Sequence, residues 1–195
     1  MTKMNGFVAA LVLSFLVLLF TAATASAQNE VELLLEAVEH LQAEEYAEAE
    51  KLVDKAKLSL WNKSSLQLTD LVFTDQEVDS IGVYRERPSS FFASGETMYF
   101  YAEPKYYTIR EDDESYHIYF TADLSIYDQE GTYLIGEKDL LQFRFMRGNP
   151  VYDVFITIAL DVDSLGLDAG DYFLEITVTD RFSQESTSGM IPFRL

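Results

Sequence analysis

Apolar residues recur at intervals of three and four along the first part of the chain, from Asn29 to about Trp61. This spacing puts them on one side of a helix and predicts amphipathic helices. The apolar positions are Val31, Leu34, Leu35, Val38 and Leu41, followed by Tyr46, Ala49, Val53, Ala56 and Leu60. Because the pattern breaks near Gln42 to Glu45, we expect two helices that form an antiparallel hairpin over residues 28–63.

From Leu66 onward the period changes to two, which predicts β-strands. Phe120 and Leu124, for example, fall on one face of a strand and Asp123 on the other, as in an antiparallel sheet with one solvated side. Residues 128–131 (Asp-Gln-Glu-Gly) predict a hairpin turn, and Pro192 suits an edge strand because it lacks an amide proton. The expected strands are 66–74, 80–85, 97–102, 116–127, 140–146, 154–160, 172–179 and 190–195.

Seven or eight short strands separated by turns predict a sandwich or a barrel. The sequence Leu-Asp-Ala-Gly-Asp-Tyr at 167–172 resembles the tyrosine corner of immunoglobulin-like and fibronectin-type-III-like domains, which many exported bacterial proteins contain. The resemblance implies that the Tyr172 ring lies in the core and that its hydroxyl bonds the backbone between about Ser164 and Asp168. A core cysteine pair and a core tryptophan are missing, since Trp61 falls in the helical segment. The expected fold is mainly β, an immunoglobulin-like antiparallel β-sandwich over 66–195 with an N-terminal α-helical hairpin.

The hairpin itself resembles a single tetratricopeptide repeat over about 30 residues. The small and aromatic packing positions of that repeat are matched by Ala37, Tyr46, Ala49, Val53 and Ala56. The sequence departs from the repeat at Glu36, where a large apolar residue is expected, and it has neither the closing proline nor a second copy. A lone unit cannot form the concave groove of stacked repeats, so an ordinary helical hairpin remains the alternative.

The first 27 residues have the pattern of a secretory signal peptide. Lys3 precedes an apolar run over 7–20, and small residues follow it to Ala27. With Ala25 and Ala27 at the spacing that signal peptidase requires, we expect cleavage before Gln28. The apolar run is shorter than the roughly 20 residues of a membrane-spanning helix, so the expected location is periplasmic or secreted, with no membrane span after cleavage.

The composition restricts the classes of partner. There is no cysteine, so stability must come from a packed core, for which 14 Phe and 12 Tyr are available. The net charge is −19, and −20 once Lys3 is removed. Such a surface disfavours nucleic acid and anionic lipid and favours cations or basic partners.

Catalytic chemistry is not indicated. His40 and His117 are the only side chains that could act as a neutral-pH base, and no nucleophile elbow, phosphate-binding loop or dinucleotide motif accompanies them. Calcium has two candidate clusters, residues 111–114 (Glu-Asp-Asp-Glu) and Asp161, Asp163, Asp168 and Asp171. The second begins like an EF-hand loop but places Leu165 and Tyr172 where oxygen ligands are needed. We expect solvated carboxylates, no cofactor and no enzyme.

Four tyrosines are the candidate contact residues. By strand alternation Tyr99, Tyr101, Tyr119 and Tyr127 face outward, where they would stack on a sugar or anchor a protein partner. Alternatively the helical hairpin covers them, and a partner then binds the acidic loops around Asp112 and Asp163.

The expected function is an exported, non-enzymatic binding or assembly module of the cell envelope, with an unidentified protein partner. A carbohydrate-binding domain that uses the tyrosines is one alternative. A small outer-membrane barrel is another, but its lipid-facing band is lacking because Thr121, Asp123, Glu175 and Thr177 occupy the second face.

Overall fold

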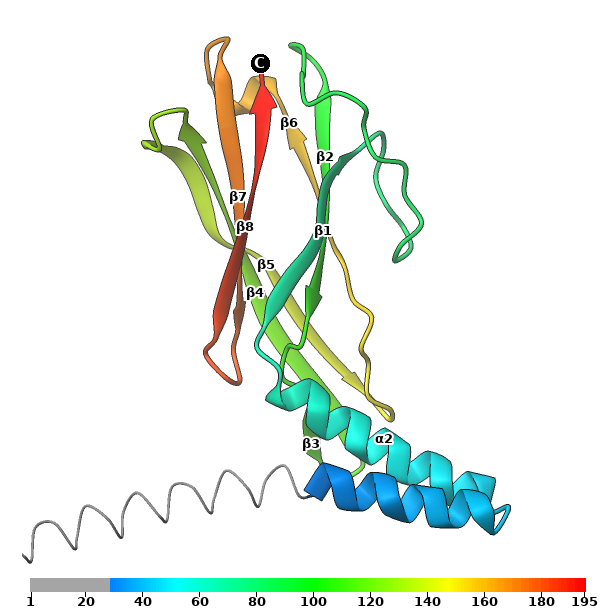
Figure 1. The fold of residues 1–195 in the computed structure, drawn as a ribbon. Coiled ribbons are helices and arrows are strands. Elements are labelled where there is room, and N and C mark those ends of the chain that lie inside the picture. Colours follow the sequence, from blue (N-terminus) through cyan, green and yellow to red (C-terminus); the bar gives the residue numbers. More distant parts are fainter. Residues whose placement is uncertain (1–28) are drawn as a thin grey trace, which may run out of the picture. The chain divides into compact units, whose positions relative to one another are not determined.

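The computed structural model describes residues 29–195 (Figure 1). The predicted signal peptide and the predicted cleavage residues Ala25, Ala27 and Gln28 lie outside the described residues. The chain divides into two compact units, one ending at Leu60 and the other spanning Trp61–Leu195. Within the described residues, no helix is both long and apolar enough to cross a membrane.

The first unit contains the helical hairpin. Residues 29–42 are helical, residues 43–45 form the turn, and α2 spans Tyr46–Lys63, its last three residues belonging to the second unit. The small side chains of Ala37, Ala49 and Ala56 are at most 2% exposed, as expected where the two helices pack against each other. Next to them Ser59 Oγ donates to the buried carboxylate of Glu30. The predicted pair of helices and the position of the break are confirmed.

The second unit consists of two antiparallel sheets (Figure 1). The three-stranded sheet has the order β1 (Gln67–Thr74), β2 (Thr97–Lys105), β6 (Ile156–Asp161). The five-stranded sheet has the order β3 (Arg110–Asp112), β4 (Ser115–Asp128), β7 (Asp171–Asp180), β8 (Ser186–Arg194), and β5 (Tyr133–Arg147) pairs with β4. A short 3-10 helix, Asp163–Leu165, connects β6 to the segment before β7.

The core lies between the inner faces of these sheets. Alternate residues of β4 and β7 are buried, and Phe120, Ile126 and Ile176 among them are at most 1% exposed. Phe73 of β1 contacts Phe193 of β8 edge to face, with ring centroids 6.4 Å apart, and so joins the two sheets. The mainly β fold, an antiparallel two-sheet sandwich with two N-terminal helices, is confirmed.

Two local predictions from the sequence are also confirmed. The turn after β4 closes through bonds from Gly131 N to the Asp128 carbonyl and from Thr132 N to the Asp128 carboxylate, and Gly131 takes a φ of +81°. β8, which contains Pro192, lies at the edge of its sheet.

Three expectations about strands are wrong. Residues 80–85 form no strand, because Gly82 adopts a left-handed φ of +67° and Val83 N bonds the Ser80 carbonyl in a turn. The three-residue strand β3 was not expected, since it is too short to show a period. β2 and β4, whose tyrosines are expected to act as one set of contact residues, belong to different sheets.

Candidate functional site

The four candidate tyrosines do not form one patch. Tyr99 and Tyr101 are on β2, whereas Tyr119 and Tyr127 are on β4 of the other sheet. The outer faces of the two sheets of a sandwich point in opposite directions. Along β4, the eight-residue step from Tyr119 to Tyr127 corresponds to about 27 Å at roughly 3.4 Å per residue. The structure therefore separates these residues rather than bringing them together.

Tyr101 is fully buried, so the expectation that it faces solvent is wrong. Its ring lies between those of Tyr84 and Phe155, at centroid distances of 4.4 and 5.6 Å. Its hydroxyl donates to Glu103 Oε1 at 2.5 Å and accepts from Gly82 N at 2.9 Å. Burial and the bond to Glu103 raise the pKa of Tyr101 well above its usual value. Tyr101 therefore fastens residues 75–85 to β2.

Glu103 belongs to the same buried group. Burial opposes ionisation of this carboxyl, but the bonds from Lys105 at 2.8 Å and from Tyr101 outweigh it, so the pKa of Glu103 is lowered. The ionised carboxylate is thus held by one cation and one phenol. This arrangement explains the position of Tyr101 structurally and offers no open site.

Tyr127 and Tyr99 are both half-buried. The Tyr127 hydroxyl donates to Glu175 Oε2 at 2.9 Å, and this bond, together with burial, raises the pKa of Tyr127. Its ring meets that of Tyr133 edge to face at 5.9 Å. Tyr99 lies in register with Thr74 and Ala159 on the neighbouring strands.

Tyr119 has cationic and aromatic neighbours. The Arg144 guanidinium carbon lies 5.7 Å from its ring centroid, and the ring of Phe182 meets it edge to face at 6.4 Å. Arg110 in turn lies 4.1 Å over the Phe182 ring. We call these four residues the cationic strip. The sequence did not reveal it, because only the pairing of β3, β4 and β5 brings Arg110 and Arg144 to either side of Tyr119.

The acidic residues of the second calcium cluster bind nearby backbone amides or an arginine. Asp161 Oδ1 accepts from Asp163 N at 2.9 Å, Asp163 Oδ1 accepts from Gly95 N at 3.1 Å, and Asp171 forms an ion pair with Arg194. Residues 111–114 run from the end of β3 into the β3–β4 turn. Among residues 29–195, no group of three or more His, Cys, Asp or Glu side chains is placed to hold a metal ion.

The two histidines occupy separate units. His40 Nδ1 lies 2.6 Å from Glu45 Oε2 in the helical turn. His117 stands on β4 in register with Arg110 on one side and Met146 on the other.

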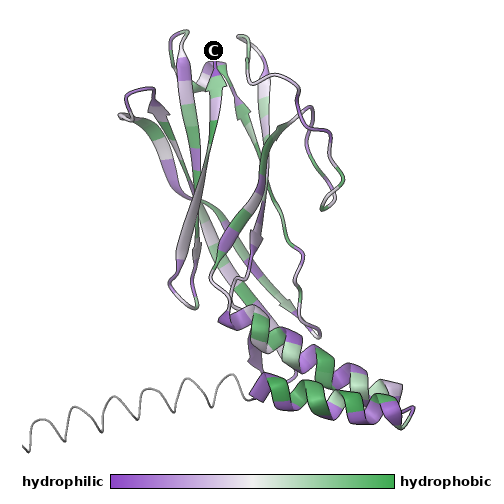
Figure 2. Ribbon diagram, in the orientation of Figure 1, coloured by the Kyte–Doolittle hydropathy of each residue, from purple (hydrophilic) through white to green (hydrophobic). Residues whose placement is uncertain are grey.

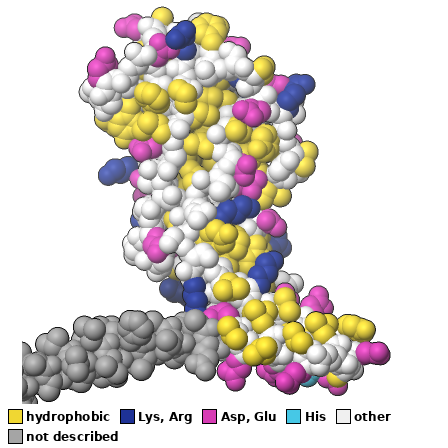
Figure 3. All heavy atoms as spheres, in the orientation of Figure 1, with side chains coloured by type: hydrophobic (Ala, Val, Ile, Leu, Met, Phe, Trp, Pro, Cys, Tyr) yellow, Lys and Arg dark blue, Asp and Glu magenta, His cyan; other side chains and the backbone are white. Residues whose placement is uncertain are grey.

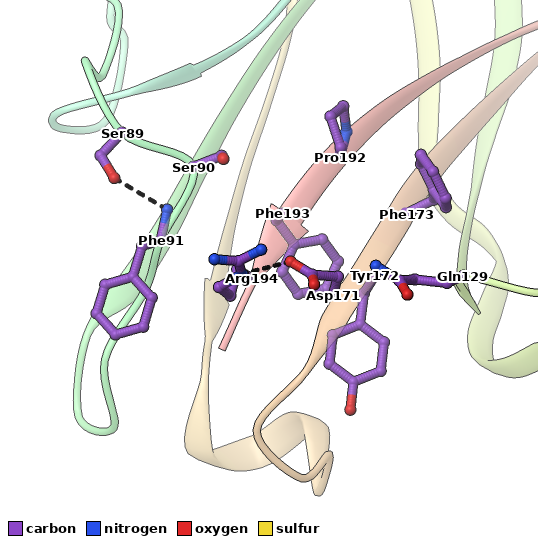
Figure 4. A pocket seen from close by; sticks show the side chains of 10 residues that line it. All are labelled: Ser89, Ser90, Phe91, Gln129, Asp171, Tyr172, Phe173, Pro192, Phe193 and Arg194. Atoms are coloured by element: carbon purple, nitrogen blue, oxygen red, sulfur yellow. Dashed lines mark hydrogen bonds and ion pairs between the residues drawn. The ribbon is translucent and has the colours of Figure 1, made fainter.

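An open pocket of about 430 Å³ lies beside the start of β7 and the end of β8 (Figure 4). The Tyr172 hydroxyl donates to the Asp168 carbonyl at 2.7 Å, and its half-buried ring packs on Phe193 with a centroid distance of 5.5 Å. On the same rim Asp171 pairs with Arg194. The predicted backbone bond of the corner is present, and the charged groups of this pocket are occupied in holding β7 to β8.

More than half of the exposed large apolar side chains within residues 29–195 lie on the hairpin, whose helices carry many hydrophobic residues (Figures 2 and 3). Eight large side chains are 42–66% exposed, and we call them the apolar face. They are Val31, Leu34, Leu35, Val38 and Leu41 on the first helix and Tyr46, Val53 and Leu60 on α2.

The apolar face is continuous across both helices. With about 100° of rotation per residue, its members span roughly 120° on the first helix and 40° on α2. On each helix, this part of the circumference lies next to the buried alanines, which are Ala37 on the first helix and Ala49 and Ala56 on α2. Because the helices are antiparallel, the two parts turn to the same side of these alanines.

Comparisons with known proteins give no family. No protein-family model matches the chain, and no curated protein matches its sequence. Among solved structures, the chain is similar to the C-terminal domain of wzt, with 17% identity, 68% of each chain covered and a TM-score of 0.35. It is also similar to the alkylpurine DNA glycosylase AlkC of Pseudomonas fluorescens, with 13% identity, 80% of this chain and 39% of that chain covered, and a TM-score of 0.41. A β-glucuronidase of Bacteroides uniformis matches with 14% identity over 66% of this chain and 13% of its own, with a TM-score of 0.29. At such TM-scores, the assignment of the fold rests on the sheets described above.

Proposed function

We propose that this protein is an exported, non-enzymatic binding or assembly module of the cell envelope that docks a partner through the apolar face of its hairpin. The observation that carries the proposal is the group of eight large apolar side chains exposed on one side of two helices. Exposed apolar patches of this kind mark interaction sites on soluble proteins.

The arrangement of small and large residues supports docking. The helices contact each other through alanines, and the larger leucines and valines are left for a further layer. Tetratricopeptide units are built in the same way, with small residues between their two helices and larger apolar residues on an outer face. Each unit buries that apolar face only against a neighbouring unit. A single hairpin that carries this pattern therefore needs a neighbour from outside the hairpin.

The expected strength is that of a reversible complex. Completing the burial of a half-exposed Leu or Val contributes about 1 kcal/mol, half of the roughly 1.5–3 kcal/mol for full burial. Eight such side chains contribute on the order of 8 kcal/mol, which is comparable to the ~4–15 kcal/mol cost of association. Additional polar contacts at the rim are needed for a stable complex.

The rim indicates the chemistry of the partner. Helical rotation places Glu32 and Glu39 beside the apolar face on the first helix, and Glu50 and Asp54 beside it on α2, with Lys57 as the basic exception. An acidic rim repels a second acidic copy and attracts lysine or arginine. The partner that fits is an amphipathic helix with basic residues beside its apolar stripe.

Export and the finer class of the sandwich are part of the proposal. The pattern of residues 1–27 supports export to the periplasm or the medium. The bond between Tyr172 and the Asp168 backbone supports an immunoglobulin-like sandwich. Carbohydrate binding through the tyrosines stays a prediction and loses its geometric basis, because Tyr101 is buried and the other three lie apart.

The test measures binding of a labelled synthetic amphipathic helix of about 18 residues, with leucines at helical spacing and flanking lysines. Leu35→Gln and Val38→Gln should each weaken binding about tenfold or more, since each loses about 1 kcal/mol of apolar burial and adds the cost of burying an amide, together at least the ~1.4 kcal/mol of a tenfold change. Val83→Gln is the matched control, because Val83 is 73% exposed on the other unit. Equal binding by the hairpin variants and the wild type would contradict the proposal. So would a concentration-dependent dimer in sedimentation that Leu35→Gln dissociates, since the occupant would then be a second copy.

A further inference from the structure

Three arginines have no carboxylate partner within the described residues, although the chain has 33 acidic and 14 basic side chains. Arg85, Arg87, Arg181 and Arg194 each form an ion pair. Among residues 29–195, Arg110, Arg144 and Arg147 contact aromatic rings instead. In so acidic a chain, these three guanidinium groups are available to carboxylates of another molecule.

Two of these arginines lie on the same face of the five-stranded sheet. Arg110 on β3 is in register with His117, and Arg144 on β5 is in register with Tyr119, two residues further along β4. The outer positions of β4 alternate with its buried ones, and His117 and Tyr119 are both outer positions. The arginines paired with them therefore lie on the outer face as well. Arg147 is in register with Tyr116, at a position of the opposite set, and is left out of the strip.

Aromatic rings hold both guanidinium groups in place. Arg110 lies 4.1 Å from the Phe182 centroid and Arg144 lies 5.7 Å from the Tyr119 centroid. The Tyr119 and Phe182 rings contact each other at 6.4 Å, so the strip is one connected group. A guanidinium that packs on an aromatic ring keeps its edge N–H groups free for bidentate hydrogen bonds to a carboxylate. Because the ring already restricts the arginine side chain, binding costs less conformational entropy.

The spacing of the arginines suits an extended chain. With β4 between them the two strands lie roughly 10 Å apart, and Arg144 is offset from Arg110 by two residues, about 7 Å, along β4, so the two backbones are separated by roughly 12 Å. Side chains on one face of an extended peptide recur about every 7 Å, so acids at alternate positions reach both guanidinium groups. Met146, 62% exposed and in register with His117, adds an apolar contact beside them.

We infer that the cationic strip binds an acidic extended segment of a partner protein, with carboxylates at alternate positions. The Arg110 guanidinium lies over the Phe182 ring, 4.1 Å from its centroid, and Arg144 lies beside the Tyr119 ring at 5.7 Å, so the charged groups rather than a stacking platform are the recognition element. A sugar ring would need free aromatic faces. This site is on the sandwich and does not depend on the function proposed for the hairpin.

The experiment uses the full mature chain and a labelled peptide of about 12 residues that alternates Glu and Ala, with a Gln–Ala peptide as the uncharged probe. Ionic strength is set near ~150 mM, where the ~8 Å Debye length screens repulsion from distant carboxylates but not contacts in the strip. Arg110→Gln and Arg144→Gln should each weaken binding of the Glu peptide at least about tenfold, as expected for a lost charge-assisted bond. Arg144→Lys should also weaken it, because lysine keeps the charge but not the two-pronged geometry.

Arg85→Gln is the matched control, since it removes the same charge from an exposed arginine outside the strip. Unchanged binding by this control supports the site. An equal loss with Arg85→Gln, or no discrimination between the Glu and Gln peptides, would overturn it. Binding of polyphosphate with no binding of the Glu peptide would also overturn it, in favour of a phosphate ligand, and a dimer that Arg144→Gln dissociates would replace the partner with a second copy.

Discussion

The hydroxyl of Tyr172 donates to the carbonyl of Asp168 at 2.7 Å, four residues upstream. The bond closes the segment that leads into β7, and Gly170 and Leu195 exchange two backbone bonds next to it. The start of β7 is thereby tied both to its own connection and to the end of the chain.

Replacing Tyr172 with Phe should lower the free energy of unfolding by about 0.5–1.5 kcal/mol, the net size of one such bond. The urea midpoint should fall with an unchanged slope, because the exposed area on unfolding is the same. Tyr133→Phe is the control, since Tyr133 is 56% exposed. An unchanged midpoint for Tyr172→Phe would contradict a structural corner.

Tyr101→Phe should be more costly, about 1–3 kcal/mol, because it leaves Glu103 and Gly82 N without the same buried partner. Residues 75–85 should then become more accessible, which limited proteolysis or hydrogen exchange measures. Equal protection of this segment in both proteins would show that Tyr101 does not fasten it.

The free energy of unfolding should depend on pH in the acid range because of the Glu103 carboxyl. Its pKa is lowered in the fold, so its contribution is present above its unfolded value near 4.5 and is lost as pH falls through the lower folded value. Wild type should therefore exceed Glu103→Gln in stability at neutral pH, and the difference should shrink below about pH 4.5. Denaturation at several pH values measures this, with Glu130→Gln in an exposed turn as the control. A difference that is constant with pH would contradict it.

The fluorescence of Trp61 should report the unfolding of the sandwich. Its indole nitrogen donates to the Tyr107 carbonyl at 2.7 Å, and its ring contacts Tyr106, Tyr107 and Tyr152. As the single tryptophan, it should change its emission together with the loss of β-structure in circular dichroism. Trp61→Phe should cost about 1–3 kcal/mol by leaving that carbonyl without its donor. Emission that changes well before the β-signal would contradict this role.

The mature N-terminus should be Gln28, because Ala25 and Ala27 have the spacing that signal peptidase needs. Mass spectrometry of the protein recovered from the periplasm or medium measures it. A chain that begins at Met1 and sediments with membranes after carbonate treatment would contradict cleavage.

The sequence predicted the elements whose period is long and regular. The alternation in β4 and β7 and the small residues Ala49 and Ala56 led to the correct sandwich and hairpin. The same alternation correctly placed Tyr101 on the outer face of β2. The period of a strand, however, shows only which face a side chain is on and not whether that face is covered. What covers that face, here Tyr84 and Phe155, depends on contacts distant in sequence.

The candidate site was harder to predict for the same reason. Tyr119 was recognised, but its neighbours Arg110 and Phe182 come from β3 and from the turn after β7. β3 has three residues and no detectable pattern, and the division into two sheets separated Tyr119 from Tyr99. Strand order, rather than strand identity, decides which side chains meet.

β5 is the longest strand, and within the described residues it pairs with β4 alone. An open edge of 15 residues that exposes Leu134, Ile135 and Met146 is a template for uncontrolled strand addition and fibril growth. A bulge interrupts it, because three residues of β5 lie opposite Asp123 alone, and Asp139 in that bulge takes a φ of +50°. The irregular stretch divides the edge into two shorter segments, and Arg144 and Arg147 place charges in the second one. Bulges and charges on an edge strand both oppose strand addition, which protects a disulfide-free protein from aggregation.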